Sequence, residues 1–167
     1  PREAEILDIG SGTGDITDEL ARRRDARCVR LDRRRLFMHG ARAPSLLCDA
    51  GALALGAGRF DHVLLVTVLH HCGDPEAVLA EAKRICMGRI LVVEDIFTSR
   101  AERLLTIVKD ALLNLELIGH PRQFHSTDEW ERIFADLGLT IETKEMFRFR
   151  LLWVVRFRNV MYVLKGT

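Results

Sequence analysis

Several features are scarce or missing in this 167-residue chain, and each absence excludes a class of protein. No apolar run approaches the roughly 18 residues that a membrane-spanning helix needs. The formal net charge is +1, from 25 basic and 24 acidic side chains, so no global field favours nucleic acid or an anionic membrane. The chain starts with proline and shows no signal peptide, so we expect a cytoplasmic protein whose upstream residues, including N-terminal helices, are missing.

Cysteine is also sparse, and its spacing matters more than its number. Cys28, Cys48, Cys72 and Cys86 are widely separated and form no C-x-x-C pair. Three of them lie in or beside apolar runs, where cysteine usually acts as a small hydrophobic residue. We therefore expect no metal site and no disulfide framework, which agrees with a reducing compartment.

What the chain does contain is a regular alternation of short apolar strands and helical segments. The apolar runs predict strands at 5–9, 28–32, 46–49, 60–69, 89–94, 139–148 and 158–165. Helices are expected after residue 14, over 33–40, after residue 74, over 99–118 and after residue 126. The run over 60–69 is almost unbroken, as in a central parallel strand that is covered on both faces. This alternation predicts one α/β domain, residues 1–167, built on a doubly wound parallel sheet.

Two of these helices carry clear start signals. Asp74 is a good N-cap residue, and Pro75 follows it at the first helical position. Residues 126–129 (Ser-Thr-Asp-Glu) form a capping box, and Gly138 is placed to end that helix. The helix boundaries on this half of the chain can therefore be predicted closely.

A glycine-rich turn links the first strand to the first helix. Its glycines, Gly10, Gly12 and Gly14, allow positive φ angles and a close approach of the backbone to a ligand. The spacing is not that of a dinucleotide-binding turn, because Asp15 occupies the position of that motif's last glycine. Asp8 lies two residues before the turn, and its carboxylate suits an ammonium group better than a pyrophosphate. The alternative is a sharp turn with a purely structural role.

Two more acidic residues end strands on the same rim of the predicted sheet. Asp32 follows Gly14 by eighteen residues, where an acid can accept both hydroxyls of a ribose. Asp49 ends the third strand and lies within reach of an adenine edge. The alternatives are a strand-end cap for Asp32 and a solvated turn residue for Asp49.

Two stretches of the chain resemble a known family. Residues 6–14 (Ile-Leu-Asp-Ile-Gly-Ser-Gly-Thr-Gly) resemble the first motif of class I S-adenosylmethionine (SAM)-dependent methyltransferases. Residues 69–84, with Leu-His-His followed by Asp-Pro, resemble a stretch of the small-molecule branch that includes ubiquinone and menaquinone methyltransferases. The resemblance implies a Rossmann-like sheet of seven mostly parallel strands with an antiparallel last strand. It also implies in-line methyl transfer from SAM to a small-molecule or lipid-like acceptor, with S-adenosylhomocysteine as product.

The resemblance also assigns residues to the cofactor. These residues are Asp8, Gly10, Ser11, Gly12, Thr13, Gly14, Asp32, Arg33, Asp49, Ala50, Thr67, Val68 and Leu69. The glycine turn would pass under the methionine part with Asp8 near its amino group, and residues 67–69 would form the floor beneath the sulfonium. The family usually has a hydrophobic residue after the ribose-binding acid, whereas this chain has arginines, so the stem of Arg33 would lie along the adenine ring.

Four histidines are candidates for the chemistry. His70 and His71 follow the fourth strand, and either could act as a general base because imidazole titrates near neutrality. The alternative is that one packs under the cofactor and the other caps the next helix. His120 and His125 flank a segment in which the family commonly builds its acceptor pocket, so both are candidate substrate contacts.

The remaining basic and apolar segments concern partners. The arginines at 22–24 and 33–35 lack interleaved aromatic residues and are interpreted as solvated faces, so no nucleic-acid partner is expected. The segment 147–158 alternates apolar residues with arginines and predicts the last hairpin of the sheet. Leu152, Trp153 and Val154 could instead form an exposed apolar tip, flanked by cations, that contacts a membrane or a lipid.

Two other functions stay open beside methyl transfer. An aminopropyl-type transferase would use a SAM relative on the same fold, but its acidic motif is missing after the fourth strand. A non-catalytic partner subunit would keep the fold alone, yet Asp8, Asp32 and the three glycines are intact. The sequence specifies neither the acceptor nor the oligomeric state.

Overall fold

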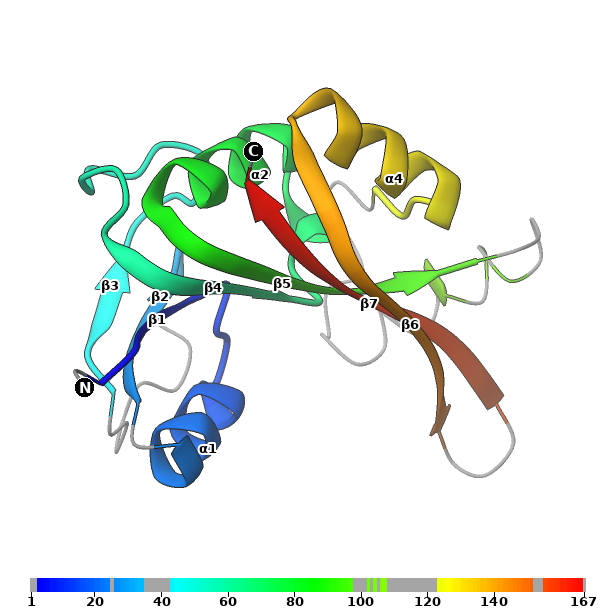
Figure 1. Cartoon of the computed structure of the whole chain (residues 1–167). Coiled ribbons are helices and arrows are strands. Elements are labelled where there is room, and N and C mark those ends of the chain that lie inside the picture. The colour runs from blue at the N-terminus through cyan, green and yellow to red at the C-terminus, as the bar shows by residue number, and fades with distance from the viewer. Residues whose placement is uncertain are drawn as a thin grey trace.

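The protein forms a single seven-stranded sheet, which the computed structural model in Figure 1 shows from its edge. The described residues are 3–24, 26–34, 43–97, 102, 104, 106–107, 123–151 and 155–166. The strands are β1 (Glu5–Ile9), β2 (Arg27–Asp32), β3 (Ser45–Leu47), β4 (Phe60–Val66), β5 (Cys86–Ile96), β6 (Leu139–Leu151) and β7 (Val155–Gly166). Their order is β3-β2-β1-β4-β5-β7-β6. The first five strands are parallel and β7 runs antiparallel to both of its neighbours, which confirms the predicted fold class.

The order of the strands places a ligand position between β1 and β4. From β1 the chain winds outward through β2 and β3, then returns to the other side of β1 with β4. Ile9 pairs with Leu31 on one side and Leu65 on the other, so the carboxyl ends of these strands meet at one rim. In open α/β sheets the crevice at such a reversal is the usual ligand site.

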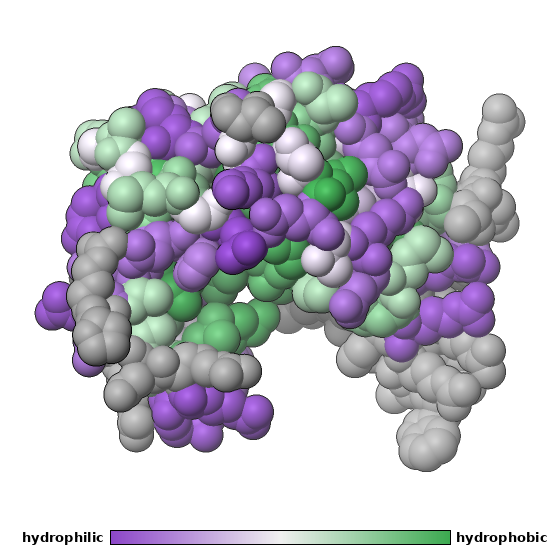
Figure 2. All heavy atoms as spheres, in the orientation of Figure 1, coloured by the Kyte–Doolittle hydropathy of each residue, from purple (hydrophilic) through white to green (hydrophobic). Residues whose placement is uncertain are grey.

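Helices cover both faces of the sheet. In Figure 1, α1 (Asp15–Arg24) lies on one face, while α2 (Pro75–Ile85) and α4 (Thr127–Asp136) lie on the other. A short 3₁₀ turn, η1 (Leu69–His71), precedes α2. No helix of the described residues is long and apolar enough to cross a membrane. In Figure 2, polar residues cover most of the visible face, and hydrophobic residues show mainly where that face is hollowed.

The predicted helix starts are confirmed. The Asp74 carboxylate accepts a hydrogen bond from the Ala77 amide at 2.9 Å, with Pro75 in the first turn. Ser126 and Glu129 form both hydrogen bonds of a capping box, and Gly138 follows α4 with a φ of 62°. Local side-chain chemistry therefore decides where these two helices begin.

Aromatic packing fixes α4 on the sheet. Trp130 and Phe134 are buried on one face of α4, with their rings stacked 6.0 Å apart. Phe134 meets Tyr162 of β7 edge to face at 5.0 Å between ring centroids. Burial of side chains of this size stabilises the fold by about 1.5–3 kcal/mol each. This packing holds α4 against β7.

Several predicted boundaries were wrong, and the causes are local. β4 ends at Val66, not at residue 69, because Thr67 turns away with a positive φ of 51°. β3 ends at Leu47, so Asp49 follows the strand and does not end it. Both strands of the final hairpin are longer than predicted, since cross-strand pairing continues out to Leu151 and Val155. The predicted helices over 33–40 and 99–118 lie mostly outside the described residues, and residues 102, 104, 106 and 107 are helical.

Candidate functional site

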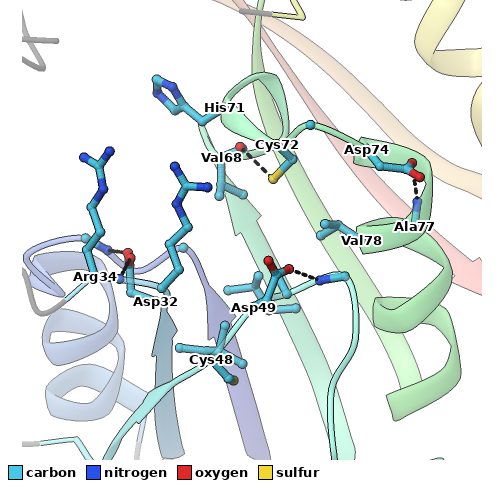
Figure 3. Close-up of a pocket in the computed structure, with 18 of the residues that line it drawn as sticks. Asp32, Arg34, Cys48, Asp49, Val68, His71, Cys72, Asp74, Ala77 and Val78 are labelled. Carbon is cyan, nitrogen blue, oxygen red and sulfur yellow. Dashed lines mark hydrogen bonds between the residues drawn. The ribbon is translucent and has the colours of Figure 1, made fainter. Parts of the chain in front are cut away.

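A cavity of about 690 Å³ opens at the carboxyl ends of the parallel strands (Figure 3). Its walls come from the segments that follow β1, β2, β3 and β4, together with the first turn of α2. The lining residues are Ile9, Gly10, Gly12, Leu31, Asp32, Arg33, Arg34, Cys48, Asp49, Ala50, Gly51, Val66, Thr67, Val68, His71, Cys72, Gly73, Asp74, Ala77 and Val78. The volume is in the range of roughly 300–1,000 Å³ that small-molecule and cofactor sites occupy.

The three glycines of the turn are required for three different reasons. All have positive φ angles: 71° at Gly10, 54° at Gly12 and 83° at Gly14. A Cβ on Gly10 would meet the side chain of Val68, and one on Gly14 would meet the guanidinium of Arg30. A Cβ on Gly12 would meet no atom within 4 Å. Gly12 therefore faces open space in the cavity, which is the space that a ligand would fill.

Asp32 joins the glycine turn to the end of β2. One of its oxygens accepts a hydrogen bond from the Gly12 amide at 3.0 Å, and the other accepts one from the Arg34 amide at 2.9 Å. The Gly10 and Ser11 amides also donate to the Leu31 carbonyl, at 2.7 and 3.1 Å. A carboxylate has about four acceptor positions, so Asp32 keeps capacity for two ligand hydroxyls. Figure 3 shows this carboxylate at the cavity wall.

Asp8 lies behind the turn and does not line the cavity, so the structure does not place it beside the amino group of a cofactor. It is 3 % exposed and accepts a hydrogen bond from the hydroxyl of Thr17 in α1. Burial raises the pKa of the Asp8 carboxyl to about 6, although the Thr17 bond and the charge of Arg30 act in the opposite direction. Arg30 is itself buried and donates to the Thr13 carbonyl at 2.5 Å. Asp8 thus belongs to the support beneath the turn.

The segment after β4 supplies the floor. Thr67 has a φ of 51°, an unfavourable angle for a β-branched residue, and its amide donates to the Val93 carbonyl at 2.7 Å. Thr67 and Val68 line the cavity, whereas the Leu69 side chain is buried in the core. Backbone strain of this kind is concentrated at ligand sites, where neighbouring contacts enforce it.

The two consecutive histidines have different environments. His71 lines the cavity, whereas His70 is 1 % exposed and does not line it. The His70 ring stacks on Phe124 at 4.6 Å, and its Nδ1 lies 2.5 Å from a carboxylate oxygen of Glu94. Of the two, His71 is the one placed to meet a ligand, and His70 fits the alternative of a packed histidine beneath the floor.

Of the other two candidate histidines, only His125 lies among the described residues. His125 packs edge to face against Trp130 at 4.7 Å, and its Nδ1 lies 4.0 Å from Glu129. It does not line the cavity. His120 lies outside the described residues. The acceptor contacts predicted for this pair stay predictions.

Some of the remaining predicted residues line the cavity, and the others shape the glycine turn behind it. Arg33, Asp49 and Ala50 line the cavity, and Asp49 accepts a hydrogen bond from the Gly51 amide at 2.8 Å. Ser11, Thr13 and Gly14 do not line it and shape the turn. Among the described residues, no group of His, Cys, Asp or Glu side chains could hold a metal ion.

Part of the wall was missed by the sequence argument. Arg34, Cys48, Cys72, Asp74 and Val78 all line the cavity. Burial raises the pKa of the Cys72 thiol to about 11, so Cys72 is a neutral part of the wall at physiological pH. A signal did exist for Asp74, because the N-cap of a helix that follows a central strand lies at the ligand rim.

The geometry agrees with what is found among known proteins. A family model described as a methyltransferase domain matches residues 7–89, which include the glycine turn, Asp32 and the floor. This match, the curated relatives and the shared fold support a class I SAM-dependent methyltransferase. A ubiquinone/menaquinone biosynthesis C-methyltransferase from Burkholderia vietnamiensis is 34 % identical over 102 residues, covering 53 % of this chain and 42 % of the relative. The chain thus spans less than half the length of the curated relatives it matches.

Solved methyltransferases share the fold over almost the whole chain. A SAM-dependent methyltransferase from Methanosarcina mazei has a TM-score of 0.76 at 15 % identity, covering 99 % of this chain and 93 % of the other. The 1,6-didemethyltoxoflavin N1-methyltransferase from Burkholderia thailandensis, solved with its substrate and S-adenosylhomocysteine, has a TM-score of 0.70 at 19 % identity. The match covers 99 % of this chain and 72 % of that enzyme. At such identities the likeness concerns the fold, and it confirms the predicted fold class.

Proposed function

We propose that the cavity binds SAM and that the protein transfers the methyl group to a small-molecule acceptor, releasing S-adenosylhomocysteine. The observation that carries the proposal is the pairing of Gly12 with Asp32. The Gly12 amide is 3.0 Å from the Asp32 carboxylate, and the space in front of Gly12 is open. A nucleoside in that space has a carboxylate for its ribose hydroxyls and a backbone free of side chains along its edge.

The cavity offers a fitting residue to each part of the cofactor. Asp32 would accept the ribose hydroxyls, while Asp49 and Ala50 would border the adenine with the aliphatic stem of Arg33 on one side. The backbone at Gly10 and Gly12 would pass along the methionine part, and Thr67 and Val68 would lie beneath the sulfonium. Asp8 would act through Thr17 and Arg30 on the turn, because it does not reach the cavity.

The chemistry makes modest demands on the protein. SAM supplies a methyl group on a positively charged sulfur, which is already an activated leaving group. The acceptor's lone pair forms the new bond to the methyl carbon as the carbon–sulfur bond breaks. The electron pair of the broken bond stays on the sulfur. Alignment of the acceptor can supply several kcal/mol of the barrier. His71 is the candidate base for an acceptor hydroxyl, a contribution of about 10²–10⁴ in rate.

Calorimetry with S-adenosylhomocysteine tests the site, and turnover of methyl-labelled SAM on phenols, quinols, amines and lipids tests the reaction. We expect binding to the wild type and strongly reduced binding to Asp32→Asn, which keeps the size of the side chain but loses its charge. Binding without turnover on any acceptor would favour a non-catalytic subunit. Turnover of decarboxylated SAM would favour an aminopropyl transferase. Binding of a pyrophosphate dinucleotide in place of S-adenosylhomocysteine would contradict the proposal.

We also propose that the β6–β7 hairpin brings the protein to a lipid surface that holds a lipid-like acceptor. In Figure 1 the hairpin projects beyond the rest of the sheet. Its register pairs Phe149 with Phe157 and, one position on, Arg150 with Arg156. Met146 and Phe147 of β6 are 58 % and 46 % exposed. Alternating apolar and cationic positions on a projecting element suit an anionic membrane surface.

The predicted apolar tip, Leu152, Trp153 and Val154, lies outside the described residues. Co-sedimentation with vesicles tests this proposal without depending on the tip's structure. We expect the protein to pellet with vesicles that contain phosphatidylglycerol and less with pure phosphatidylcholine, and Trp153→Ser to reduce pelleting. Equal recovery of wild type and Trp153→Ser in the supernatant of both mixtures would contradict it.

A further inference from the structure

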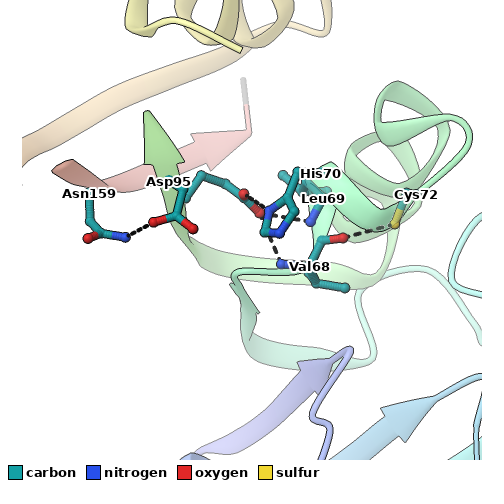
Figure 4. Close-up of polar contacts among 7 residues, drawn as sticks. Val68, Leu69, His70, Cys72, Asp95 and Asn159 are labelled. Carbon is teal, nitrogen blue, oxygen red and sulfur yellow. Dashed lines mark hydrogen bonds and ion pairs between the residues drawn. The ribbon is translucent and has the colours of Figure 1, made fainter. Parts of the chain in front are cut away.

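We propose that Glu94 is a positioning residue for cofactor binding, because its buried carboxylate holds the floor of the cavity in a strained conformation (Figure 4). This inference rests on the proposed function. Glu94 lies near the end of β5 and is 1 % exposed, and it does not line the cavity itself. Its influence on a ligand must therefore pass through the floor residues that it holds.

Two backbone amides and an imidazole nitrogen converge on this carboxylate. Oε1 accepts hydrogen bonds from the amides of Val68 at 3.0 Å and Leu69 at 2.8 Å. Oε2 lies 2.5 Å from Nδ1 of His70. The neighbouring Asp95 points to the other side of the strand and accepts a hydrogen bond from Asn159 of β7 at 2.7 Å (Figure 4). Two adjacent carboxylates thus serve different purposes, and only that of Glu94 is directed to the floor.

The floor needs such a partner because its backbone leaves the sheet abruptly. Thr67 adopts a left-handed conformation, so the amides of the next two residues cannot continue the hydrogen bonding of β4. A buried amide without an acceptor is strongly unfavourable, and the Glu94 carboxylate satisfies two of them at once. The conformation that results places the Val68 side chain directly against Gly10 of the glycine turn. The position of the floor relative to the glycine turn thus depends on Glu94.

A carboxylate suits this position better than a neutral amide. An ionised carboxylate only accepts hydrogen bonds, so it can serve the two backbone amides and the His70 ring together. Hydrogen bonds to an ionised acceptor are about twice as strong as neutral ones. A glutamine that keeps its oxygen on the two backbone amides would turn an N–H group to His70, so Nδ1 of the ring would have to accept and the ring proton would lie on Nε2. The contacts to the amides would then also lose the strength that the charge gives them.

His70 extends the arrangement to the segment before α4. Its carbonyl accepts a hydrogen bond from the Gln123 amide at 3.0 Å, and its ring stacks on Phe124. The Gln123 side chain donates to the Gly73 carbonyl at 2.9 Å. The contacts from Glu94 therefore reach both the floor of the cavity and the chain that leads into α4, through a single buried histidine.

The test compares Glu94→Gln with Ile85→Val, a control that loses one methyl group from the core at the end of α2. The S-adenosylhomocysteine dissociation constant is measured by calorimetry, and amide hydrogen exchange is measured on the free protein. We expect Glu94→Gln to weaken binding about tenfold, in line with the loss of one hydrogen bond to a charged group. The Val68 and Leu69 amides should exchange faster in this variant. The control should leave both readouts unchanged.

A second pair of variants keeps the proposal testable if Glu94→Gln does not fold. His70→Asn retains an N–H group near the position of Nδ1 and should bind S-adenosylhomocysteine nearly as well as the wild type, whereas His70→Ala should bind it more weakly. Wild-type affinity in Glu94→Gln and His70→Ala would overturn the proposal, as would unchanged exchange at Val68 and Leu69. If the wild type binds no S-adenosylhomocysteine, the proposed function fails, while the exchange data still decide whether Glu94 holds the floor.

Discussion

Gly12→Ala should separate ligand binding from folding at the glycine turn. The added methyl group enters space with no atom within 4 Å, so it creates no collision in the free protein. The φ of 54° remains unfavourable for alanine, at a cost of about 1–2 kcal/mol. For a domain of this size each kcal/mol lowers the melting temperature by roughly 2–4 °C. The expected decrease is therefore about 2–8 °C, and the variant should fold.

Gly14→Ala is the matched control, because it carries the same kind of strain with a different neighbour. Its φ is 83°, and the new Cβ would meet the guanidinium of the buried Arg30. Arg30 would have to move and to release the Thr13 carbonyl, which leaves a buried charged group with fewer partners. Loss of such a contact costs about a further 1–3 kcal/mol. Gly14→Ala should thus be clearly less stable than Gly12→Ala.

Thermal unfolding is measured without ligand, and affinity is measured by calorimetry with S-adenosylhomocysteine. If the reasoning is correct, the two assays rank Gly12→Ala and Gly14→Ala in opposite orders. Gly12→Ala should lose at least about tenfold in affinity, equivalent to about 1.4 kcal/mol, because its methyl group occupies ligand space. Gly14→Ala should show the larger loss of melting temperature. Unchanged affinity in Gly12→Ala would refute the placement of the ligand against the turn. Equal destabilisation of the two variants would refute the assignment of Arg30 as the obstacle.

Three more predictions concern single residues. Burial raises the Asp8 pKa from 3.8 to about 6, so the stability from its bound proton is present below about pH 4 and is lost as the pH rises through 6. At about 1.4 kcal/mol per pH unit, the advantage of Asp8→Asn over the wild type in urea unfolding should grow by about 2.4 kcal/mol from pH 4 to pH 7, and a constant difference would contradict this. His71→Ala should lower kcat by about 10²–10⁴ with little change in S-adenosylhomocysteine affinity if the acceptor is a hydroxyl, and an unchanged rate would exclude it as the base. Ser126→Ala removes the N-cap of α4 and should lower the unfolding free energy by about 1 kcal/mol in the same urea assay without altering ligand affinity.

The sequence predicted the features that depend on neighbouring residues. Apolar runs locate the strands, and the capping residues Asp74 and Ser126 locate two helix starts, because these signals act within one turn of the backbone. Asp32 was placed correctly at the cavity wall, since the carboxyl end of β2 must meet the turn that follows β1. This position follows from the parallel pairing of β1 and β2 and does not depend on the side chains around it.

Features that depend on distant residues could not be predicted. His70 is buried while His71 lines the cavity, and the partner of the buried His70 is Glu94, 24 residues away in the chain. The inward direction of Asp8 is set by Thr17 and Arg30, and a buried arginine two residues before Asp32 has no local signal. Arg34 and the thiol of Cys72, which the sequence did not indicate, line the cavity only because four strand ends converge there.

The glycine turn is tied down before any ligand arrives. The Gly10 and Ser11 amides bond to β2, the Gly12 amide bonds to Asp32, and the Thr13 carbonyl bonds to Arg30. A nucleoside that enters this site has little backbone freedom to remove, so the entropic penalty of association is small. Such rigidity also keeps the turn from reshaping around a bulkier ligand. Under the proposed function, the turn itself would therefore select nucleosides that carry no bulky group on the edge that faces Gly12.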